Sequence, residues 1–314
     1  MAFFGGKLSR QVSHPRGSSA RRADMLHHFH FSDRSVRKTF VAIAIGAVVG
    51  ATAVGVGSAP MASAAPPPAG CGHYSDAVAG NPPNTRIKLW ERVKDAKKSA
   101  TPDTRGNIRV VQPEKQNPKL YSIRSGGDHP GFGDDFLLVP TNRIQGIECS
   151  YLWDGSQLNF WRYAWKEGTT TVYKNPNKPL AIGVNSADAR GQDQLHLHMA
   201  QANPATVTAL KAIKKPETNL NRWAAPTSNV VLPVNDYKNK KRTDAVFRVV
   251  KYTGQMPNLV KVLHTQVQSD IPHQCIAVIA SGAPNTYYLL NSTPALKSGN
   301  DRGTGLCDYV YGWN

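Results

Sequence analysis

His196 and His198, two positions apart, form the most suggestive chemical pattern in this sequence. They lie in the run Leu195–Met199, in which apolar and polar residues alternate. Alternate side chains of a β-strand share one face and rise about 3.3 Å per residue, so Gln194, His196 and His198 would line that face in a row. On a helix, residues two apart point to nearly opposite sides. The spacing therefore predicts a strand that presents both imidazoles to one cleft.

Two imidazoles on one strand suit three interpretations. They can ligate a zinc or iron ion, with a third ligand from His129, His264 or His273. One can instead be a nucleophile, because a neutral imidazole attacks phosphorus while its neighbour orients it or handles a proton. The third interpretation is a structural pair that only makes hydrogen bonds. The residues alone leave all three open, since an H-x-H spacing is not specific.

The predicted site strand belongs to a hairpin within Pro179–Ala200. Its first apolar run, Leu180–Val184, is followed by a polar, turn-rich segment, as in a β-hairpin with a long loop. Elsewhere, short apolar runs separated by turn residues predict an α+β fold: an antiparallel β-sheet with a few flanking helices. Further strands are expected at Leu120–Ile123, Asp135–Pro140, Ala245–Tyr252, Gln274–Ala280 and Thr286–Asn291, helices at Arg86–Ala100, Ser156–Lys166 and Pro204–Lys215, and a polar loop at Pro102–Pro118.

The first 64 residues differ from the rest of the chain. They hold eight Lys and Arg but two Asp, and so contribute part of the net charge of +17. Arg37 and Lys38 precede an apolar run, Phe40–Val56, and an Ala-Ser-Ala sequence ends at Ala64. This order is typical of an export signal, and an uncleaved membrane anchor is the alternative. We expect residues 1–64 to be that signal or anchor, and 65–314 to form a single domain, either secreted or held at the extracytoplasmic face of the membrane.

Four cysteines follow the predicted signal: Cys71, Cys149, Cys275 and Cys307. An even number of cysteines in an oxidising compartment predicts two disulfides, for which three pairings are possible. No C-x-x-C sequence occurs, so a zinc knuckle or a redox motif has little support.

Three blocks of the sequence resemble a known family. Phe136–Glu148 resembles a strand and turn written LLMPT-R-I-G-E, and Leu158–Trp165 resembles an aromatic helix. Leu180–Ser186 and then Arg190–His198 resemble a hairpin that leads into a histidine triad. In this order they resemble the CDP-diacylglycerol pyrophosphatase family of the histidine-triad superfamily. The resemblance is clear over residues 135–210 and weaker to about residue 291, and it implies a histidine-triad-like fold.

The sequence departs from this pattern at two positions. Gln194 stands where the triad has its first histidine, and Arg143 where the wider superfamily often has another. A glutamine can still hydrogen-bond but cannot carry charge. The arginine brings a fixed positive charge that suits phosphate.

The resemblance implies a mechanism that needs neither metal nor cofactor. His196 would be the nucleophile that attacks the cytidylyl phosphorus of CDP-diacylglycerol, and His198 would bind the phosphate or move a proton. A covalent histidine–CMP intermediate would then be hydrolysed. The implied partner is a lipid-linked nucleotide at a membrane surface, and no nucleic acid is expected. The residues expected to position the phosphate oxygens are Asn185, Gln192, Gln194 and Arg143.

Two other functions remain open. The same site would serve a hydrolase or transferase of soluble nucleotides. Alternatively, the chain is an exported nucleotide- or lipid-binding protein whose turnover is weakened by Gln194. Release of CMP and phosphatidate from CDP-diacylglycerol would separate the first function from these two.

Overall fold

This computed structural model describes residues 71, 85–93, 107–111, 121–126, 136–154, 158–172, 179–236, 239 and 241–312. The chain divides into two compact units, Met1–Gly57 and Ser58–Asn314, and every described residue belongs to the second. The predicted export segment, residues 1–64, and His129 lie outside the described residues. Within the described ranges, no helix is both long and apolar enough to cross a bilayer.

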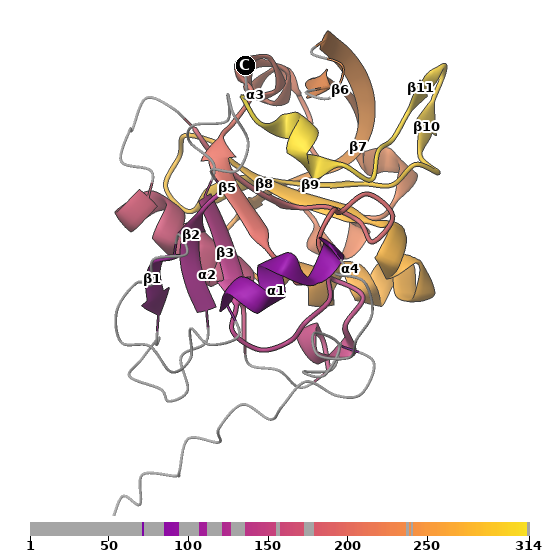
Figure 1. The fold of residues 1–314 in the computed structure, drawn as a ribbon. Helices are drawn as coiled ribbons and strands as arrows, with labels where there is room; N and C mark the ends of the chain where they lie inside the picture. Colours follow the sequence, from indigo (N-terminus) through magenta and orange to yellow (C-terminus); the bar gives the residue numbers. More distant parts are fainter. Residues whose placement is uncertain are drawn as a thin grey trace, which may run out of the picture. The chain divides into compact units, whose positions relative to one another are not determined.

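Nine described strands form one antiparallel sheet in the order β1-β2-β3-β5-β4-β8-β9-β7-β6 (Figure 1). With its few helices, this sheet confirms the predicted α+β fold. The strands are β1 (Asn107–Val111), β2 (Tyr121–Ser125), β3 (Phe136–Pro140), β4 (Leu180–Val184), β5 (Leu197–Gln201), β6 (Asn229–Asp236), β7 (Lys241–Thr253), β8 (Cys275–Ala280) and β9 (Thr286–Ser292), and a separate pair consists of β10 (Lys297–Ser298) and β11 (Asp301–Arg302).

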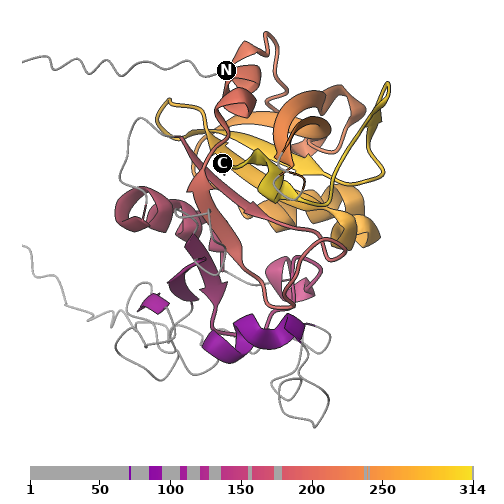
Figure 2. The same cartoon turned by 45° about the horizontal axis from the view of Figure 1, so that its top comes forward.

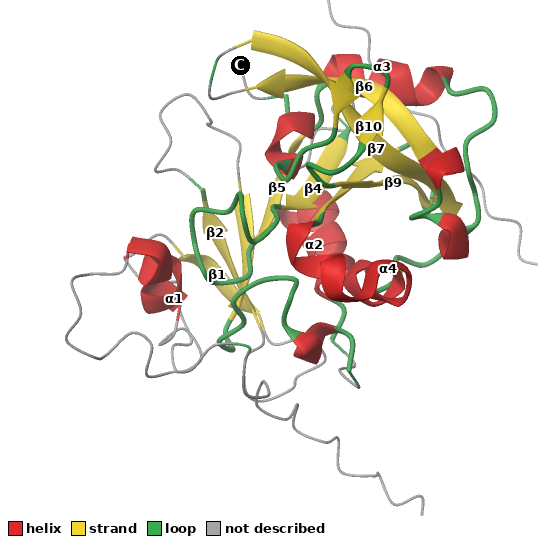
Figure 3. Cartoon of the chain, turned by 90° about the vertical axis from the view of Figure 1, so that its right-hand side faces the viewer, coloured by secondary structure: helices red, strands yellow, loops and turns green. Residues whose placement is uncertain are grey.

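Helices pack on both faces of this sheet. The side chains of α2 and α4 join a hydrophobic cluster that includes Ile182, Leu197 and Met199, and Figure 3 shows these two helices together. The opposite cluster contains Ala181 and Ala200, with side chains of α3 and of the C-terminal turn η9. The helices are α1 (Lys88–Val93), α2 (Phe160–Glu167), α3 (Pro204–Ala212) and α4 (Leu259–Val267), and the short turns used below are η8 (Gln268–His273) and η9 (Cys307–Val310).

The alternation along β5 determines where the predicted site faces. Leu197 and Met199 belong to the cluster under α2 and α4, whereas Ala200 belongs to the opposite one. His198 therefore faces the side of α3 and the C-terminal segment, because alternate residues of a strand share a face. Figures 1 and 2 draw the C-terminal segment in yellow, and it lies against the sheet. Its turn η9 packs against β4, β6 and β8.

Some elements differ from the expected ones. β1 lies inside Pro102–Pro118, which we expected to be a loop, and β6 and α4 were not predicted. Ser156, which we expected to cap the aromatic helix, lies outside the described residues. Helix α2 begins at Phe160, and its N-cap is Asn159, whose side chain accepts the Arg162 N–H at 3.1 Å. A cap three residues before that N–H satisfies one of the free donors at the helix start.

The structure selects one of the three possible cysteine pairings. Cys71 is bonded to Cys149, and Cys275 is bonded to Cys307. The first bond joins a segment before the sheet to the turn after β3. The second joins the start of β8 to η9, and so attaches the C-terminal segment to the sheet.

We predict that peptide mapping without reduction will find these two cross-linked pairs and no free thiol. The partners lie 78 and 32 residues apart in sequence, so each bond strongly restricts the unfolded chain. Loss of one native disulfide should lower the free energy of unfolding by roughly 2–5 kcal/mol. Four titratable thiols in the native protein, or a Cys149–Cys275 peptide, would contradict this pairing.

Candidate active site

The β4–β5 hairpin carries the two histidines, and main-chain hydrogen bonds hold its long loop. The Leu195 N–H donates to the Ile144 carbonyl, and the Asp193 N–H donates to the Arg86 carbonyl, both at 2.6 Å. On the other side of the loop, the Ala187 N–H donates to Pro272 at 2.8 Å. Segments distant in sequence therefore determine the path of the chain into His196.

His196 is buried, with 8% of its surface exposed, and one ring nitrogen is already bonded. Its Nδ1 lies 2.6 Å from the carbonyl oxygen of Gln194. A carbonyl oxygen only accepts hydrogen bonds, so Nδ1 must carry the proton. The neutral ring then has its lone pair on Nε2, which is the atom that a nucleophilic imidazole uses.

Burial keeps this ring neutral. Burial, then the neighbouring His198, and then the charge of Arg190 lower the pKa of His196 to about 3, although its bond to Gln194 acts in the opposite direction. An unperturbed histidine has a pKa of about 6.5 and would be partly protonated near neutral pH. His196 is therefore in the form that can attack an electrophile throughout the neutral range.

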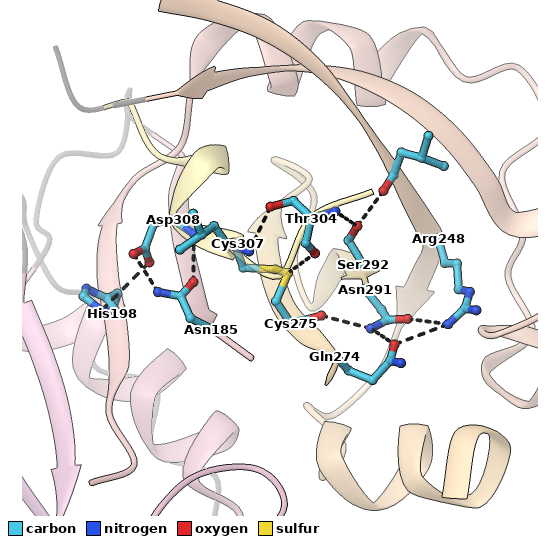
Figure 4. The surroundings of a disulfide bond; sticks show 12 residues. Asn185, His198, Arg248, Gln274, Cys275, Asn291, Ser292, Thr304, Cys307 and Asp308 are labelled. Atoms are coloured by element: carbon cyan, nitrogen blue, oxygen red, sulfur yellow. Dashed lines mark hydrogen bonds and ion pairs between the residues drawn. A yellow bond between two sulfur atoms is a disulfide. The ribbon is translucent and has the colours of Figure 1, made fainter. Parts of the chain in front are cut away.

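His198 lies beside His196 and faces a carboxylate. The centroids of the two rings are 5.1 Å apart, and Nε2 of His198 is 3.9 Å from Oδ1 of Asp308 (Figure 4). The Tyr311 ring is 6.1 Å from the His198 ring. The structure thus brings the two predicted histidines together and adds an acidic and an aromatic residue from the C-terminal segment.

Asn185, a predicted phosphate ligand, connects to this acid. Its Nδ2 donates to Oδ2 of Asp308 at 2.6 Å, and its Oδ1 accepts the Asp308 N–H at 3.3 Å. Asp308 and Tyr311 were not predicted as site residues from the sequence. The available signal was Cys307, because a disulfide at that position attaches the tail to the sheet.

Gln194, in the loop that leads into β5, contacts Arg143, in the turn that follows β3. The Gln194 amide donates to the carbonyls of Pro140 and Asn142, both at 2.9 Å, and accepts from the Ile144 N–H at 3.3 Å. Arg143 donates to the Gln194 side chain at 3.3 Å and to the carbonyl of Asp193. Both side chains are buried in these contacts, so their binding to phosphate stays a prediction.

Gln192 contacts a different element. Its Oε1 accepts the Leu89 N–H of α1 at 2.8 Å, and its Nε2 donates to the Gly191 carbonyl at 3.1 Å. In this structure Gln192 joins the hairpin loop to α1, and its role toward phosphate likewise stays a prediction.

A network of ion pairs fixes the same loop. Arg190 makes two bonds to Glu148, at 2.7 and 2.6 Å, and its Nε lies 3.1 Å from Asp193. Arg86 pairs with Asp193 through two bonds of 2.8 Å. The hydrogen bond from Arg86 is the main cause that lowers the pKa of Asp193, and the hydrogen bond and charge of Arg190 lower it further. Together they outweigh burial, which would raise the pKa. Gly146 leaves room for this arrangement, since an added Cβ there would meet the Arg190 guanidinium.

Two of the three residues suggested as a third metal ligand, His264 and His273, have other contacts. The His264 ring stacks on Trp153 with centroids 4.2 Å apart, and Nδ1 of His273 is 2.6 Å from Asp188. Within the part of the chain that the structure describes, no three His, Cys, Asp or Glu side chains are grouped so that they could hold a metal ion.

Comparison with known proteins agrees with the resemblance in the three sequence blocks. The family model for CDP-diacylglycerol pyrophosphatase matches residues 128–306, which is more than half of the chain. The chain belongs to the CDP-diacylglycerol pyrophosphatase family. The match includes the β4–β5 hairpin and both histidines, but ends two residues before Asp308.

Individual members of the CDP-diacylglycerol pyrophosphatase family are similar over shorter stretches. A probable CDP-diacylglycerol pyrophosphatase of Mycobacterium leprae is 29% identical over 164 residues, which cover 50% of this chain and 57% of that protein. A CDP-diacylglycerol pyrophosphatase of Mycobacterium bovis is 35% identical over 86 residues, covering 26% and 33%. One of Yersinia pestis is 35% identical over 81 residues, covering 24% and 31%. The chain thus spans between about a third and somewhat over half of these relatives.

The first prediction from this geometry concerns the charge of His196. In the protein labelled with nitrogen-15 in histidine, the His196 ring should stay neutral, with its proton on Nδ1, from about pH 5 to pH 8. His273 is the internal control, because its bond to Asp188 raises its pKa above the usual 6.5. As the pH falls, His273 should become protonated while His196 does not. A His196 signal that titrates near pH 6.5 would contradict the arrangement.

The second prediction concerns Gln194→His, which places a third histidine beside His196 and His198 in the sequence. The side-chain amide of Gln194 donates hydrogen bonds to the carbonyls of Pro140 and Asn142. A histidine cannot make both of these hydrogen bonds, so a buried carbonyl would lose its donor. We expect the free energy of unfolding to fall by roughly 1–3 kcal/mol. The rate of substrate hydrolysis should not increase. Gln192→His is the matched control, and its loss should be smaller because Gln192 is partly exposed. A faster variant with unchanged stability would contradict a mainly structural role for Gln194.

Proposed function

We propose that this protein hydrolyses the pyrophosphate bond of CDP-diacylglycerol and releases CMP and phosphatidate. Membership of the CDP-diacylglycerol pyrophosphatase family supports this reaction and substrate. The observation that carries the mechanism is the Nδ1 bond of His196 to the Gln194 carbonyl, which leaves Nε2 as the nucleophilic atom. His196 and His198 are the proposed catalytic residues.

The reaction would proceed in two displacements at one phosphorus. In the first, the Nε2 lone pair of His196 bonds to the phosphorus that carries cytidine, and the bond to the bridging oxygen breaks. Phosphatidate leaves with that electron pair, and CMP stays on the imidazole. In the second, water attacks the same phosphorus, the nitrogen–phosphorus bond breaks toward the ring, and CMP is released. His198, at 5.1 Å between ring centroids, is the nearby group that can carry the proton of the water.

Burial of His196 favours attack over protonation, but it also makes the ring a weak base. The anionic pyrophosphate would offset this effect, because a negative charge near an imidazole raises its pKa. The Arg190 charge acts on the same ring, and it would also attract the phosphate. The nucleophile would thus gain basicity when substrate binds.

Phosphate contacts are proposed for Asn185, Gln192, Gln194 and Arg143. Each of these side chains bonds to protein in this structure. Direct contact with phosphate would require each group to exchange a partner or to use a remaining donor. Asn185 is the best placed, because it contacts Asp308 next to His198.

The remaining features suit a lipid-linked substrate outside the cytoplasm. We propose that residues 1–64 are an export signal or anchor and that residues 65–314 form one histidine-triad-like domain that works at a membrane surface. Support comes from the Arg37–Lys38 pair before the apolar run Phe40–Val56, and from the two disulfides, which persist in oxidising compartments. Free thiols in the native protein would count against export.

The mechanism predicts a trapped intermediate. With CDP-diacylglycerol labelled in the cytidylyl phosphate, an alkaline quench should recover label on His196, because a phosphoramidate is more stable in alkali than in acid. His196→Ala should abolish both the label and CMP release. His198→Ala should slow CMP release by roughly 10²–10⁴, the usual effect of losing an acid–base partner. His264→Ala is the matched control, since this ring stacks on Trp153 away from the pair, and its rate should be unchanged.

The same assay tests the alternatives. Hydrolysis should persist in EDTA; loss of activity that zinc restores would favour the metal interpretation. A soluble CDP-alcohol turned over as fast as CDP-diacylglycerol would favour a hydrolase of soluble nucleotides. CMP release at full rate from His196→Ala, or label on another residue, would show that the mechanism is wrong.

A further inference from the structure

The carboxylate of Asp308 is buried and oriented. Only 6% of the residue is exposed, and its Oδ1 lies 3.9 Å from Nε2 of His198. Two bonds to Asn185 fix the group: the Asn185 oxygen accepts the Asp308 main-chain N–H, and its amide nitrogen then faces the Asp308 carboxylate. The amide therefore cannot flip without losing both bonds, and the carboxylate is held facing the imidazole.

We propose that Asp308 is the positioning residue of His198, and that the Cys275–Cys307 disulfide keeps it in place; the catalytic part of this inference rests on the proposed function. A carboxylate that faces one ring nitrogen selects the tautomer with its proton there and stabilises the charged ring. Contacts of this kind are often long before substrate binds and shorten afterwards. Asp308 would thus keep His198 ready to carry a proton.

The segment that carries Asp308 needs outside support. It is a 3₁₀ turn of four residues, η9, and so short a helix is not stable alone. The disulfide attaches its first residue, Cys307, to Cys275 at the start of β8. The next residue of β8, Ile276, pairs with Val184, immediately before Asn185. Neighbouring strands thus hold η9 from two sides, once covalently and once through the Asn185 side chain (Figure 4).

The rest of the tail lies along the same strands. The Gly312 N–H donates to the Gln201 carbonyl of β5 at 2.7 Å, and the Tyr311 hydroxyl lies 3.5 Å from the His198 carbonyl. Gly183 makes this approach possible, because a Cβ there would meet the Tyr311 hydroxyl. The C-terminal segment therefore contacts His198 both at its ring and at its main chain.

The test uses Asp308→Asn in the full chain, a change that keeps the size of the side chain and removes its charge. The kcat for CMP release should fall by roughly 10- to 100-fold, the range found for partners that orient a metal-ligating histidine, with little change in KM. Asp301→Asn, which changes a carboxylate of β11, is the control and should retain the wild-type kcat.

A double variant tests the role of the disulfide. Cys275→Ser with Cys307→Ser should lower kcat by a similar factor, and adding Asp308→Asn should cause little further loss, because both changes remove the same interaction. Cys71→Ser with Cys149→Ser is the matched control, and the ring signals of His198 should not change in it. Full additivity of the two losses would overturn the role assigned to the disulfide. If the double variant does not fold, as judged by near-ultraviolet circular dichroism, Asp308→Asn alone decides the positioning role.

Nitrogen-15 spectra of the histidine rings separate this inference from the proposed function. Asp308→Asn should change the ring nitrogen signals of His198 and leave those of His273 unchanged. Unchanged His198 signals would overturn the positioning role, even if activity fell. If the signals change but the wild-type protein releases no CMP from CDP-diacylglycerol, Asp308 still positions His198 and the proposed function fails.

Discussion

The hydrogen bond from Nδ1 of His196 to the carbonyl oxygen of Gln194 is the constraint on which the site depends. It determines which nitrogen carries the proton and therefore which one carries the lone pair. That carbonyl has a fixed direction because the Gln194 side chain is bonded to the turn that follows β3. A main-chain group thus sets the chemistry of the ring, and a neutral side chain sets the position of that main-chain group.

Two distant parts of the chain hold the hairpin from opposite sides. On one side, Arg190 pairs with Glu148 and Asp193, and Arg86 completes the network. Arg190 is the most buried member of this network, and loss of one of its acidic partners would leave part of its charge uncompensated, so the pairs favour one geometry of the loop. On the other side, the disulfide-bonded C-terminal turn places Asp308 against His198. Contacts from both parts of the chain therefore hold the long loop in place.

The buried contacts of Gln194 explain why a neutral amide suits this position. A histidine there would bring a titratable ring into a fully buried position that already contains Arg143. An amide instead supplies a donor group and an acceptor oxygen without charge, and the structure uses both. The supporting contacts of this site are thus compatible with an amide at position 194.

Much of the fold followed from local patterns. Short apolar runs separated by turn residues predicted the β4–β5 hairpin and the late strands. Most side chains of β4, β8 and β9 are buried on both faces of the sheet, which explains why these runs are continuously apolar. Strand β6 and helix α4 were not predicted. Pro233 argues against a strand, yet β6 contains it at the edge of the sheet, where a missing N–H costs little. α4 was missed although Asn258 caps it, its side chain accepting the Lys261 N–H at 3.2 Å.

By itself, the sequence determined the β4–β5 hairpin, the family and an even set of cysteines, since these depend on apolar runs, motif order and composition. The strand expected from Leu195 begins only at Leu197, so His196 lies just before β5 and not within it. Only the tertiary structure decided the cysteine pairing, the protonated nitrogen of His196 and the partner of His198. Asp308 lies 110 residues after His198 in the chain, yet its carboxylate is 3.9 Å from the ring. No local pattern encodes such a contact, because it arises where antiparallel pairing and a disulfide bring the C-terminal turn back onto the middle of the sheet.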